Sequence, residues 1–163
     1  MKRITKVMFF ALALLLISTT VAAAGATTRY YKITVGETSD ENFGRSGVTF
    51  IKAYYSGKLK LTKISKDAAP GDPPFKVTQK PMDVRFRNYK GEWMYEVNNP
   101  VYVYFKLRNA ELEKWQAGKL AIYTYNHGTW KECPTYEVWG RYSGEMRVSC
   151  RMKHYALYAV GVK

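Results

Sequence analysis

The chain has 163 residues, a length suited to one globular domain, and its 26 Lys and Arg residues against 13 Asp and Glu residues give a net charge of +13. This charge favours polyanionic partners, such as wall polymers, lipopolysaccharide, acidic polysaccharide or nucleic acid, with an ordinary lysine-rich soluble surface as the alternative. Aromatic residues make up 15% of the chain and include 14 tyrosines, which favours β-structure, because tyrosine suits a half-exposed sheet face.

The N-terminus resembles a secretory leader in its order of charges and apolar residues. A basic start precedes an apolar run from Val7 to Ile17, which is shorter than the roughly 20 residues that span a bilayer. Small residues then form Ala-x-Ala sites, so cleavage is predicted after Ala24 or Ala26. Removing residues 1–26 takes away three basic residues and no acid, so the charge falls to 13 − 3 = +10. Residues 27–163 are predicted to form a single domain without a membrane span.

The first half of this domain reads as short strands separated by polar turns. A polar stretch, residues 36–47, is predicted to be a loop, and Ser56-Gly57-Lys58 is predicted to join two strands into a hairpin. Residues 65–74 hold three prolines and a glycine, so a long loop is expected there. The predicted strands are residues 28–35, 48–55, 59–64, 75–78, 82–86 and 93–97.

The second half opens with the clearest pattern in the chain, the strict alternation of residues 101–108. Val101, Val103 and Phe105 would share the buried face of a strand, and the residues between them would point outward. A short helix or 3₁₀ segment is expected near 109–117, capped by Asn109. Further strands are predicted at residues 120–125, 130–133, 146–150 and 155–162, the last apolar on both faces and so central in a sheet. The fold class predicted from these patterns is an all-β antiparallel sandwich.

Two cysteines, Cys133 and Cys150, lie after the leader. Export implies an oxidising compartment, so a disulfide is predicted between them, with two free thiols as the alternative. Their spacing places them opposite each other on neighbouring strands of a hairpin that turns near Arg141 and Tyr142. Such a bridge contributes about 3 kcal/mol in the chain-entropy model.

The ending of the chain is similar to a known kind of module. A Leu-x-Ile-Tyr-x-Tyr strand (120–125), Trp130, a glycine turn at Gly144, Val148-Ser149 and an ending from His154 to Gly161 follow in that order. This order resembles a β-sandwich accessory module found near the C-termini of exported bacterial proteins, over about residues 84–163. The resemblance implies a sandwich fold and carries over no catalytic residue. Tyr155-Ala156 after the histidine and the two cysteines depart from the module's pattern.

Few residues suggest catalytic or metal chemistry. A zinc site from His127, Cys133, Cys150 and His154 is disfavoured, because positions 150 and 154 on one strand lie about 13 Å apart. The acidic cluster of residues 37–41 lacks the spacing of an EF-hand, and no nucleophile motif or paired carboxylates stand out. We therefore expect no metal, no cofactor and no catalytic residue, with a small secreted hydrolase kept as the alternative function.

Basic and aromatic residues interleave along several predicted strands, a pattern that can bind polyanions and stack on sugars or bases. No fold motif of specific nucleic-acid binding accompanies them. The sequence therefore predicts a non-catalytic secreted module of the cell envelope or extracellular space that binds an anionic polymer or has a structural role. The candidate ligand-binding residues are Lys58, Lys60, Arg85, Arg87, Tyr102, Tyr104, Lys106 and Arg108.

Overall fold

The computed structural model of the chain describes residues 25–139 and 145–163, so most of the predicted leader and the turn near Arg141 and Tyr142 lie outside the described residues. One sheet contains β1 (Thr27–Ile33), β4 (Gly57–Lys63), β5 (Lys76–Val77), β6 (Met82–Asn88), β7 (Trp93–Met94), β9 (Leu120–Asn126), β10 (Thr129–Cys133) and β13 (Leu157–Val162). The other contains β2 (Ser39–Phe43), β3 (Ser46–Phe50), β8 (Val101–Lys106), β11 (Thr135–Trp139) and β12 (Met146–Arg151). The helix α1 spans Asn109–Gln116, and a 3₁₀ turn spans Lys66–Ala68.

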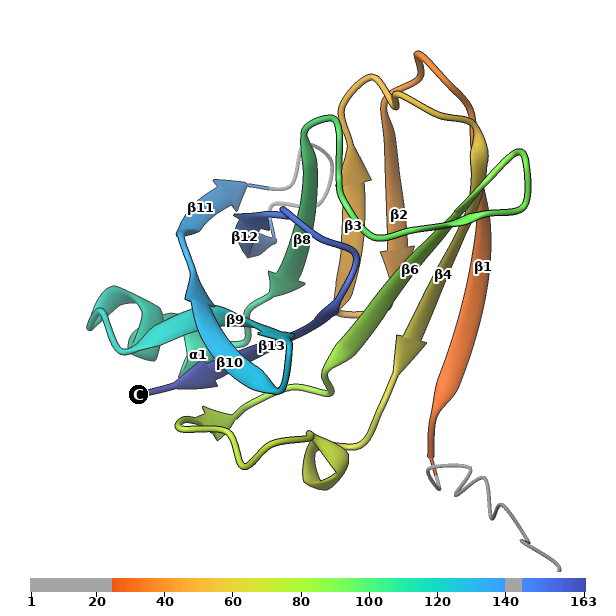
Figure 1. Cartoon of the computed structure of the whole chain (residues 1–163). Coiled ribbons are helices and arrows are strands. Elements are labelled where there is room, and N and C mark those ends of the chain that lie inside the picture. Colours follow the sequence, from red (N-terminus) through yellow and green to blue (C-terminus); the bar gives the residue numbers. More distant parts are fainter. Residues whose placement is uncertain (1–24, 140–144) are drawn as a thin grey trace, which may run out of the picture.

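The two antiparallel sheets pack face to face (Figure 1). The 8-stranded sheet, called the larger sheet, has the order β1-β4-β6-β13-β9-β10, with β5 beside β13 and β7 beside β6. The 5-stranded sheet, called the smaller sheet, has the order β11-β12-β8-β3-β2. The predicted all-β antiparallel sandwich with one short helix is therefore confirmed.

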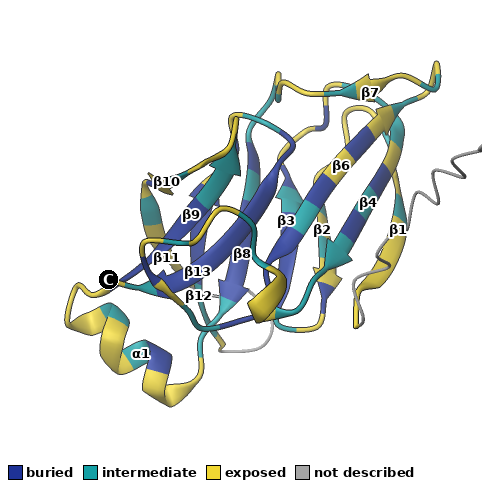
Figure 2. Ribbon diagram, turned by 60° about the horizontal axis from the view of Figure 1, so that its bottom comes forward, coloured by how far each residue is buried: buried dark blue, intermediate teal, exposed yellow. Residues whose placement is uncertain are grey.

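The core lies between the sheets and follows the alternation of the strands. On β8 the predicted buried residues Val101, Val103 and Phe105 have no exposed surface, as expected for one face of a pleated strand. Figure 2 shows the same alternation of buried and more exposed residues along β4 and β6. β13 is buried on both faces and lies between β6 and β9, which confirms its predicted central place.

Two predictions for the first half were wrong because neighbouring strands belong to different sheets. The predicted loop of residues 36–47 contains β2, a polar edge strand that pairs with β3. The predicted hairpin over Ser56-Gly57-Lys58 does not form, since β3 pairs with β2 and β8 while β4 pairs with β1 and β6. The apolar sides of β3 and β4 instead face the core from opposite sheets, with Val48 and Phe50 buried on β3 and Leu59 and Leu61 buried on β4.

The predicted disulfide between Cys133 and Cys150 is present, with 6.0 Å between the Cα atoms. Its predicted setting was wrong, because the residue opposite Cys150 on the neighbouring strand is Thr135 of β11. Cys133 ends β10 in the larger sheet, and the chain then passes through Pro134 into the smaller sheet. The bridge therefore joins the two sheets at the point where the chain crosses between them.

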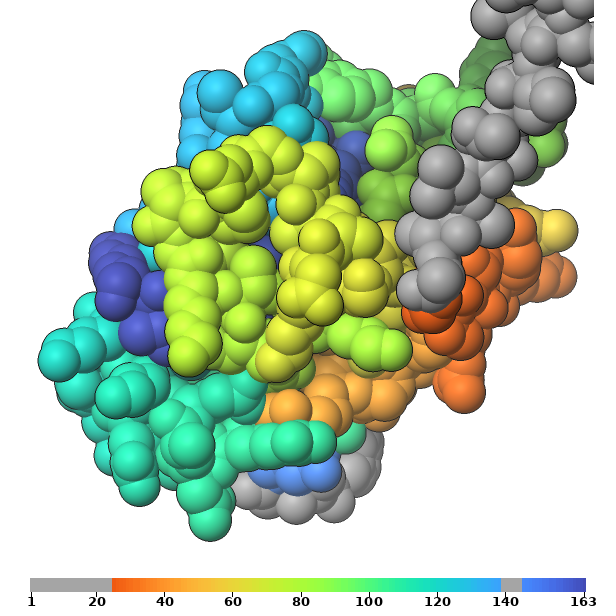
Figure 3. Space-filling view, turned by 90° about the horizontal axis from the view of Figure 1, so that it is seen from below, coloured from red at the N-terminus to blue at the C-terminus, as the bar shows by residue number. Residues whose placement is uncertain are grey.

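The proline-rich loop covers half of the outer face of the larger sheet. We call residues 65–75 the cover segment. The Phe75 ring stacks on Tyr123 with 3.7 Å between ring centroids, and the Trp130 indole N–H donates to the Pro70 carbonyl at 2.7 Å. In Figure 3 the yellow and yellow-green atoms of this part of the chain lie over the sheet beside the cyan β9–β10 hairpin. The cover segment thus packs on β9 and β10 and leaves the outer side chains of β1, β4 and β6 open.

The helix α1 has the predicted bounds, but its N-cap is Arg108 instead of Asn109. The buried carboxylate of Glu111 accepts hydrogen bonds from the Arg108 backbone N–H at 2.9 Å, from the Gln79 amide at 3.2 Å, and from the Arg45 guanidinium. Burial pushes the pKa of Glu111 up, but the Arg108 backbone N–H and the hydrogen bond and positive charge of Arg45 outweigh it and hold the pKa below its usual value. Within residues 25–139 and 145–163, no helix is long and apolar enough to cross a membrane.

Candidate functional site

The predicted binding residues lie on the outer faces of both sheets. Lys58 and Lys60 are on β4 and Arg85 and Arg87 are on β6, all in the larger sheet. The other group belongs to β8 of the smaller sheet and the residue that caps α1; it consists of Tyr102, Tyr104, Lys106 and Arg108. Because the sheets pack by their inner faces, the two groups are on opposite sides of the sandwich and do not form one surface.

The larger sheet aligns its outward cations in two rows across the strands. Lys58 lies opposite Lys32 of β1 on one side and opposite Arg87 of β6 on the other, and Trp93 of β7 follows Arg87. In the adjacent row, Lys60 lies between Tyr30 of β1 and Arg85 of β6. We call this surface the basic strip; it consists of Tyr30, Lys32, Lys58, Lys60, Arg85, Arg87 and Trp93.

Aromatic rings are interleaved with the cations of the strip. The Lys58 ammonium lies 5.7 Å from the centroid of the Tyr30 ring, and the Arg87 guanidinium lies 5.7 Å from that of Trp93. Both rings remain widely exposed, Tyr30 at 60% and Trp93 at 59%. These contacts hold the cations near an aromatic surface that is still free to contact a ligand.

The positive charge of the strip is poorly neutralised by the protein. Among the described residues, Lys32, Lys58 and Lys60 form no ion pair. Arg85 alone in the strip is paired, through its Nε at 3.0 and 3.1 Å from the two carboxylate oxygens of Asp83. The strip therefore presents excess positive charge to solvent.

Two of the candidates on the smaller sheet, Tyr104 and Lys106, are occupied by contacts within the protein. Tyr104 is only 2% exposed, because its ring fills the space left by the missing side chain of Gly47 and lies under the Arg147 guanidinium, 4.4 Å from the ring centroid. Arg147 in turn donates to Asp40 at 2.8 Å, and Lys106 pairs with Glu145 at 2.6 Å. Burial raises the pKa of Tyr104 above its usual value. Tyr104 is thus a packing residue of this face.

A groove of about 490 Å³ opens beside the basic strip, within the size range of small-ligand sites. It lies between β6, the tip of the β9–β10 hairpin and the cover segment. We call it the lateral groove; its lining residues are Thr62, Ile64, Ala68, Pro70, Asp83, Arg85, Tyr95, Tyr125, Asn126, His127, Tyr155, Ala156 and Leu157.

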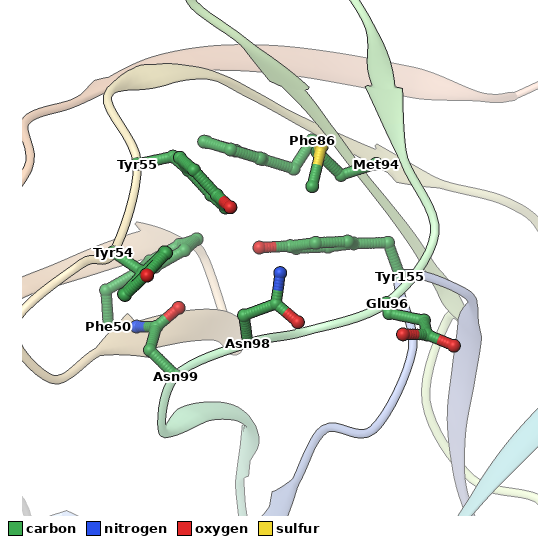
Figure 4. Close-up of a pocket in the computed structure, with 9 residues that line it drawn as sticks. All are labelled: Phe50, Tyr54, Tyr55, Phe86, Met94, Glu96, Asn98, Asn99 and Tyr155. Carbon is green, nitrogen blue, oxygen red and sulfur yellow. The ribbon is translucent and has the colours of Figure 1, made fainter.

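Two other hollows occur among the described residues. One, of about 680 Å³, lies near the disulfide and is bordered by Lys131, Arg151 and Lys153. The other encloses about 10 Å³, space for about one water molecule, so it is too small for an organic ligand. Figure 4 shows that the hydroxyls of Tyr55 and Tyr155 point into this small space.

The chemical groups in these hollows bear on the alternatives weighed from the sequence. Cys133 and Cys150, the two sulfur ligands of the zinc site considered from the sequence, form the disulfide. In the part of the chain that the structure describes, no group of three or more metal-binding side chains occurs. The carboxylates that line the hollows are Asp83 in the lateral groove, Glu132 in the larger hollow and Glu96 in the small one. None of these spaces brings together the carboxylate pair on which glycoside hydrolysis depends.

Comparisons with known proteins do not name a relative. No family model, no curated protein and no solved structure matches the chain. The resemblance of its ending to an accessory module of exported bacterial proteins therefore stays a prediction. The function has to be inferred from the surface itself.

Sequence patterns located four of the seven residues of the basic strip. Lys58, Lys60, Arg85 and Arg87 were recognised by their alternation, but Lys32 and the two exposed rings were missed. The signal for Tyr30 and Lys32 is the alternation within residues 28–35, and Trp93 lies in the predicted strand 93–97; neither tells which strand pairs with which. The groove was missed as well, because its residues come from separate segments of the chain, including the turn between β9 and β10.

Proposed function

We propose that the protein is an exported, non-catalytic β-sandwich module that binds an anionic polymer of the cell envelope or extracellular space through the basic strip. One observation carries this proposal, the alignment of Lys32, Lys58 and Arg87 directly opposite one another, with Lys60 and Arg85 in the next row. Like charges that face each other across strands destabilise a sheet. A polyanion lying on the strip relieves this repulsion, so binding and fold stability are coupled.

The rest of the molecule supports the proposal in charge and in location. Without residues 1–26 the net charge is 13 − 3 = +10, which attracts polyanions over a distance, and the two rows offer several contacts at once to a repeating chain of charges. The disulfide between Cys133 and Cys150 is consistent with an oxidising compartment outside the cytoplasm. The leader predicted from the sequence agrees with such a location.

Retention on immobilised heparin in a salt gradient tests the proposal. We expect the protein to bind at low salt and to elute earlier when the strip cations are replaced. With about 0.5 kcal/mol for each exposed ion pair, the loss is about 2 kcal/mol, or roughly thirtyfold in affinity. The test variant carries Lys58→Gln, Lys60→Gln, Arg85→Gln and Arg87→Gln.

A matched control separates the strip from net charge. It removes the same charge from exposed lysines outside the strip, and we expect it to elute close to the unmodified protein. Equal losses for both variants, or flow-through of the unmodified protein at low salt, would contradict the proposal. The control carries Lys52→Gln, Lys76→Gln, Lys114→Gln and Lys119→Gln, all at exposed positions.

A further inference from the structure

The lateral groove continues the surface of the basic strip. Arg85 belongs to both, and Thr62 lies opposite Asp83 where β4 meets the groove. Leu157, the first residue of β13, lies between Asp83 of β6 and Tyr125 of β9 and forms part of the groove floor. A polymer that crosses the strands along the strip therefore reaches the groove without leaving the protein surface.

One aromatic wall of the groove is held rigidly by its neighbours. The Tyr125 ring packs against Trp130, with 5.1 Å between the ring centroids. On another side the backbone of Gly71 approaches so closely that a Cβ at this position would lie 2.6 Å from the Tyr125 ring. Because the ring is fixed before a ligand arrives, binding to it costs little conformational entropy.

The second aromatic wall, Tyr95, is fixed in the same way. Its ring stacks on His154 with 4.7 Å between the ring centroids. Its hydroxyl lies 2.8 Å from the Asn126 side-chain oxygen and 3.0 Å from the His127 Nε2. Tyr95 is nevertheless 43% exposed, so a ligand in the groove can contact it.

The polar groups of the groove select the chemistry of its occupant. Asp83 places a carboxylate there that is paired with Arg85, and its oxygens have further acceptor sites for hydrogen bonds from hydroxyl groups. Thr62 and Asp83 approach from the sheet, while Asn126 and His127 approach from the hairpin. Polar groups on several sides suit a ring whose hydroxyls point outward in several directions around its edge. A nucleic-acid base, by contrast, presents its polar atoms in one plane.

We propose that the lateral groove binds a sugar ring of the anionic polymer, so that the polymer is an acidic polysaccharide. This inference rests on the function proposed above. The strip binds the acidic groups of the polymer, and the groove binds one sugar unit. The apolar C–H face of that unit packs on Tyr95 or Tyr125, and its hydroxyls bond to Asp83 and Asn126. The strip alone would bind any polyanion, whereas the groove selects a polyanion that contains sugar rings.

Calorimetric titration of the full chain with three probes of matched charge tests this inference. The probes are an oligogalacturonate, a linear polyphosphate without sugar rings, and a single-stranded oligothymidylate. Stacking on one aromatic ring commonly changes affinity by tenfold or more, so we expect oligogalacturonate to bind at least about tenfold more tightly than polyphosphate. The same advantage is expected over oligothymidylate, because a thymine base can stack but presents its polar atoms in one plane and cannot bond to the polar groups on several sides of the groove.

Two variants of groove residues make the test specific. Tyr95→Ala should weaken oligogalacturonate binding about tenfold and leave polyphosphate binding unchanged. Asp83→Asn should lower the ratio of oligogalacturonate to polyphosphate affinity about fivefold, because it replaces one of the two acceptor oxygens for sugar hydroxyls by an NH2 donor. Circular dichroism spectra that match the unmodified protein serve as the control for folding.

The possible failures point to different conclusions. If oligogalacturonate and polyphosphate bind equally and Tyr95→Ala changes neither, the groove inference is wrong while the proposed function stands. Binding of none of the probes at low salt overturns the proposed function and the inference together. Tighter binding of oligothymidylate that is lost in Tyr95→Ala assigns the groove to nucleic acid and overturns the sugar assignment.

Discussion

Replacing Lys58 by threonine should stabilise the fold at low salt. Lys58 has a like charge on each side, Lys32 and Arg87, and two unit charges about 5 Å apart in water repel by about 0.8 kcal/mol. The change thus removes about 1.6 kcal/mol of repulsion and loses the contact with the Tyr30 ring, which is worth about 0.5–1 kcal/mol at an exposed site. The net expected gain in the free energy of unfolding is about 0.5–1 kcal/mol.

Salt should reverse the sign of this effect. The screening length falls from about 30 Å in 0.01 M salt to about 3 Å in 1 M salt, so at high salt only the loss of the Tyr30 contact remains. Urea unfolding of Lys58→Thr and of the unmodified protein at both salt concentrations measures the difference. The exposed helix residue Lys114 supplies the control, since Lys114→Thr removes the same charge outside the strip. A gain that persists in 1 M salt, or no gain at low salt, would refute an electrostatic cost of the strip.

Three further predictions concern the structural links. Replacing Cys133 and Cys150 by serine should lower the free energy of unfolding by about 3 kcal/mol in the chain-entropy model, measured by urea unfolding. Glu111→Gln should lower the free energy of unfolding by about 2–3 kcal/mol near neutral pH, because it weakens charged hydrogen bonds. Since the pKa of Glu111 is lowered in the fold, this loss should be constant above the unperturbed glutamate pKa of about 4.3 and shrink at lower pH. Gly47→Ala should cost about 1–3 kcal/mol in thermal unfolding, because the added methyl group meets the Tyr104 ring.

Each of these predictions has a result that contradicts it. Unchanged stability of the serine variant would mean that the bridge between the sheets does not constrain the unfolded chain. A Glu111→Gln cost that grows as the pH falls would reverse the sign of the pKa shift. Full stability of Gly47→Ala would show that the Tyr104 ring has room to move.

Local patterns were enough for the strands and the core but not for the pairing of strands. Alternation in residues 101–108 identified β8 and its buried side, because a half-buried strand has a period of two. It does not show which sheet a strand joins, and for this reason the hairpin between β3 and β4 was predicted wrongly. The polar strand β2 has no apolar alternation to reveal it, since it lies at a sheet edge and pairs on one side only.

The same distinction explains what was predicted of the candidate site. Lys58 and Arg85 were identified from their own strands, but the alignment of cations across β1, β4 and β6 depends on long-range register. Tyr104 has the outward position that alternation predicts, yet it is buried because Gly47 on the neighbouring strand leaves room for its ring. Such neighbour effects are absent from the sequence of a single strand.

Residue-resolved mapping of polymer binding tests the role of the basic strip most directly. Backbone amide chemical shifts of the protein are followed by NMR while an acidic polysaccharide such as heparin is added at low salt. We predict that the shift changes concentrate on the outward positions of β1, β4, β6 and β7. Changes concentrated instead on β8 and β12, on the opposite face of the sandwich, would contradict the assignment of the strip as the binding surface.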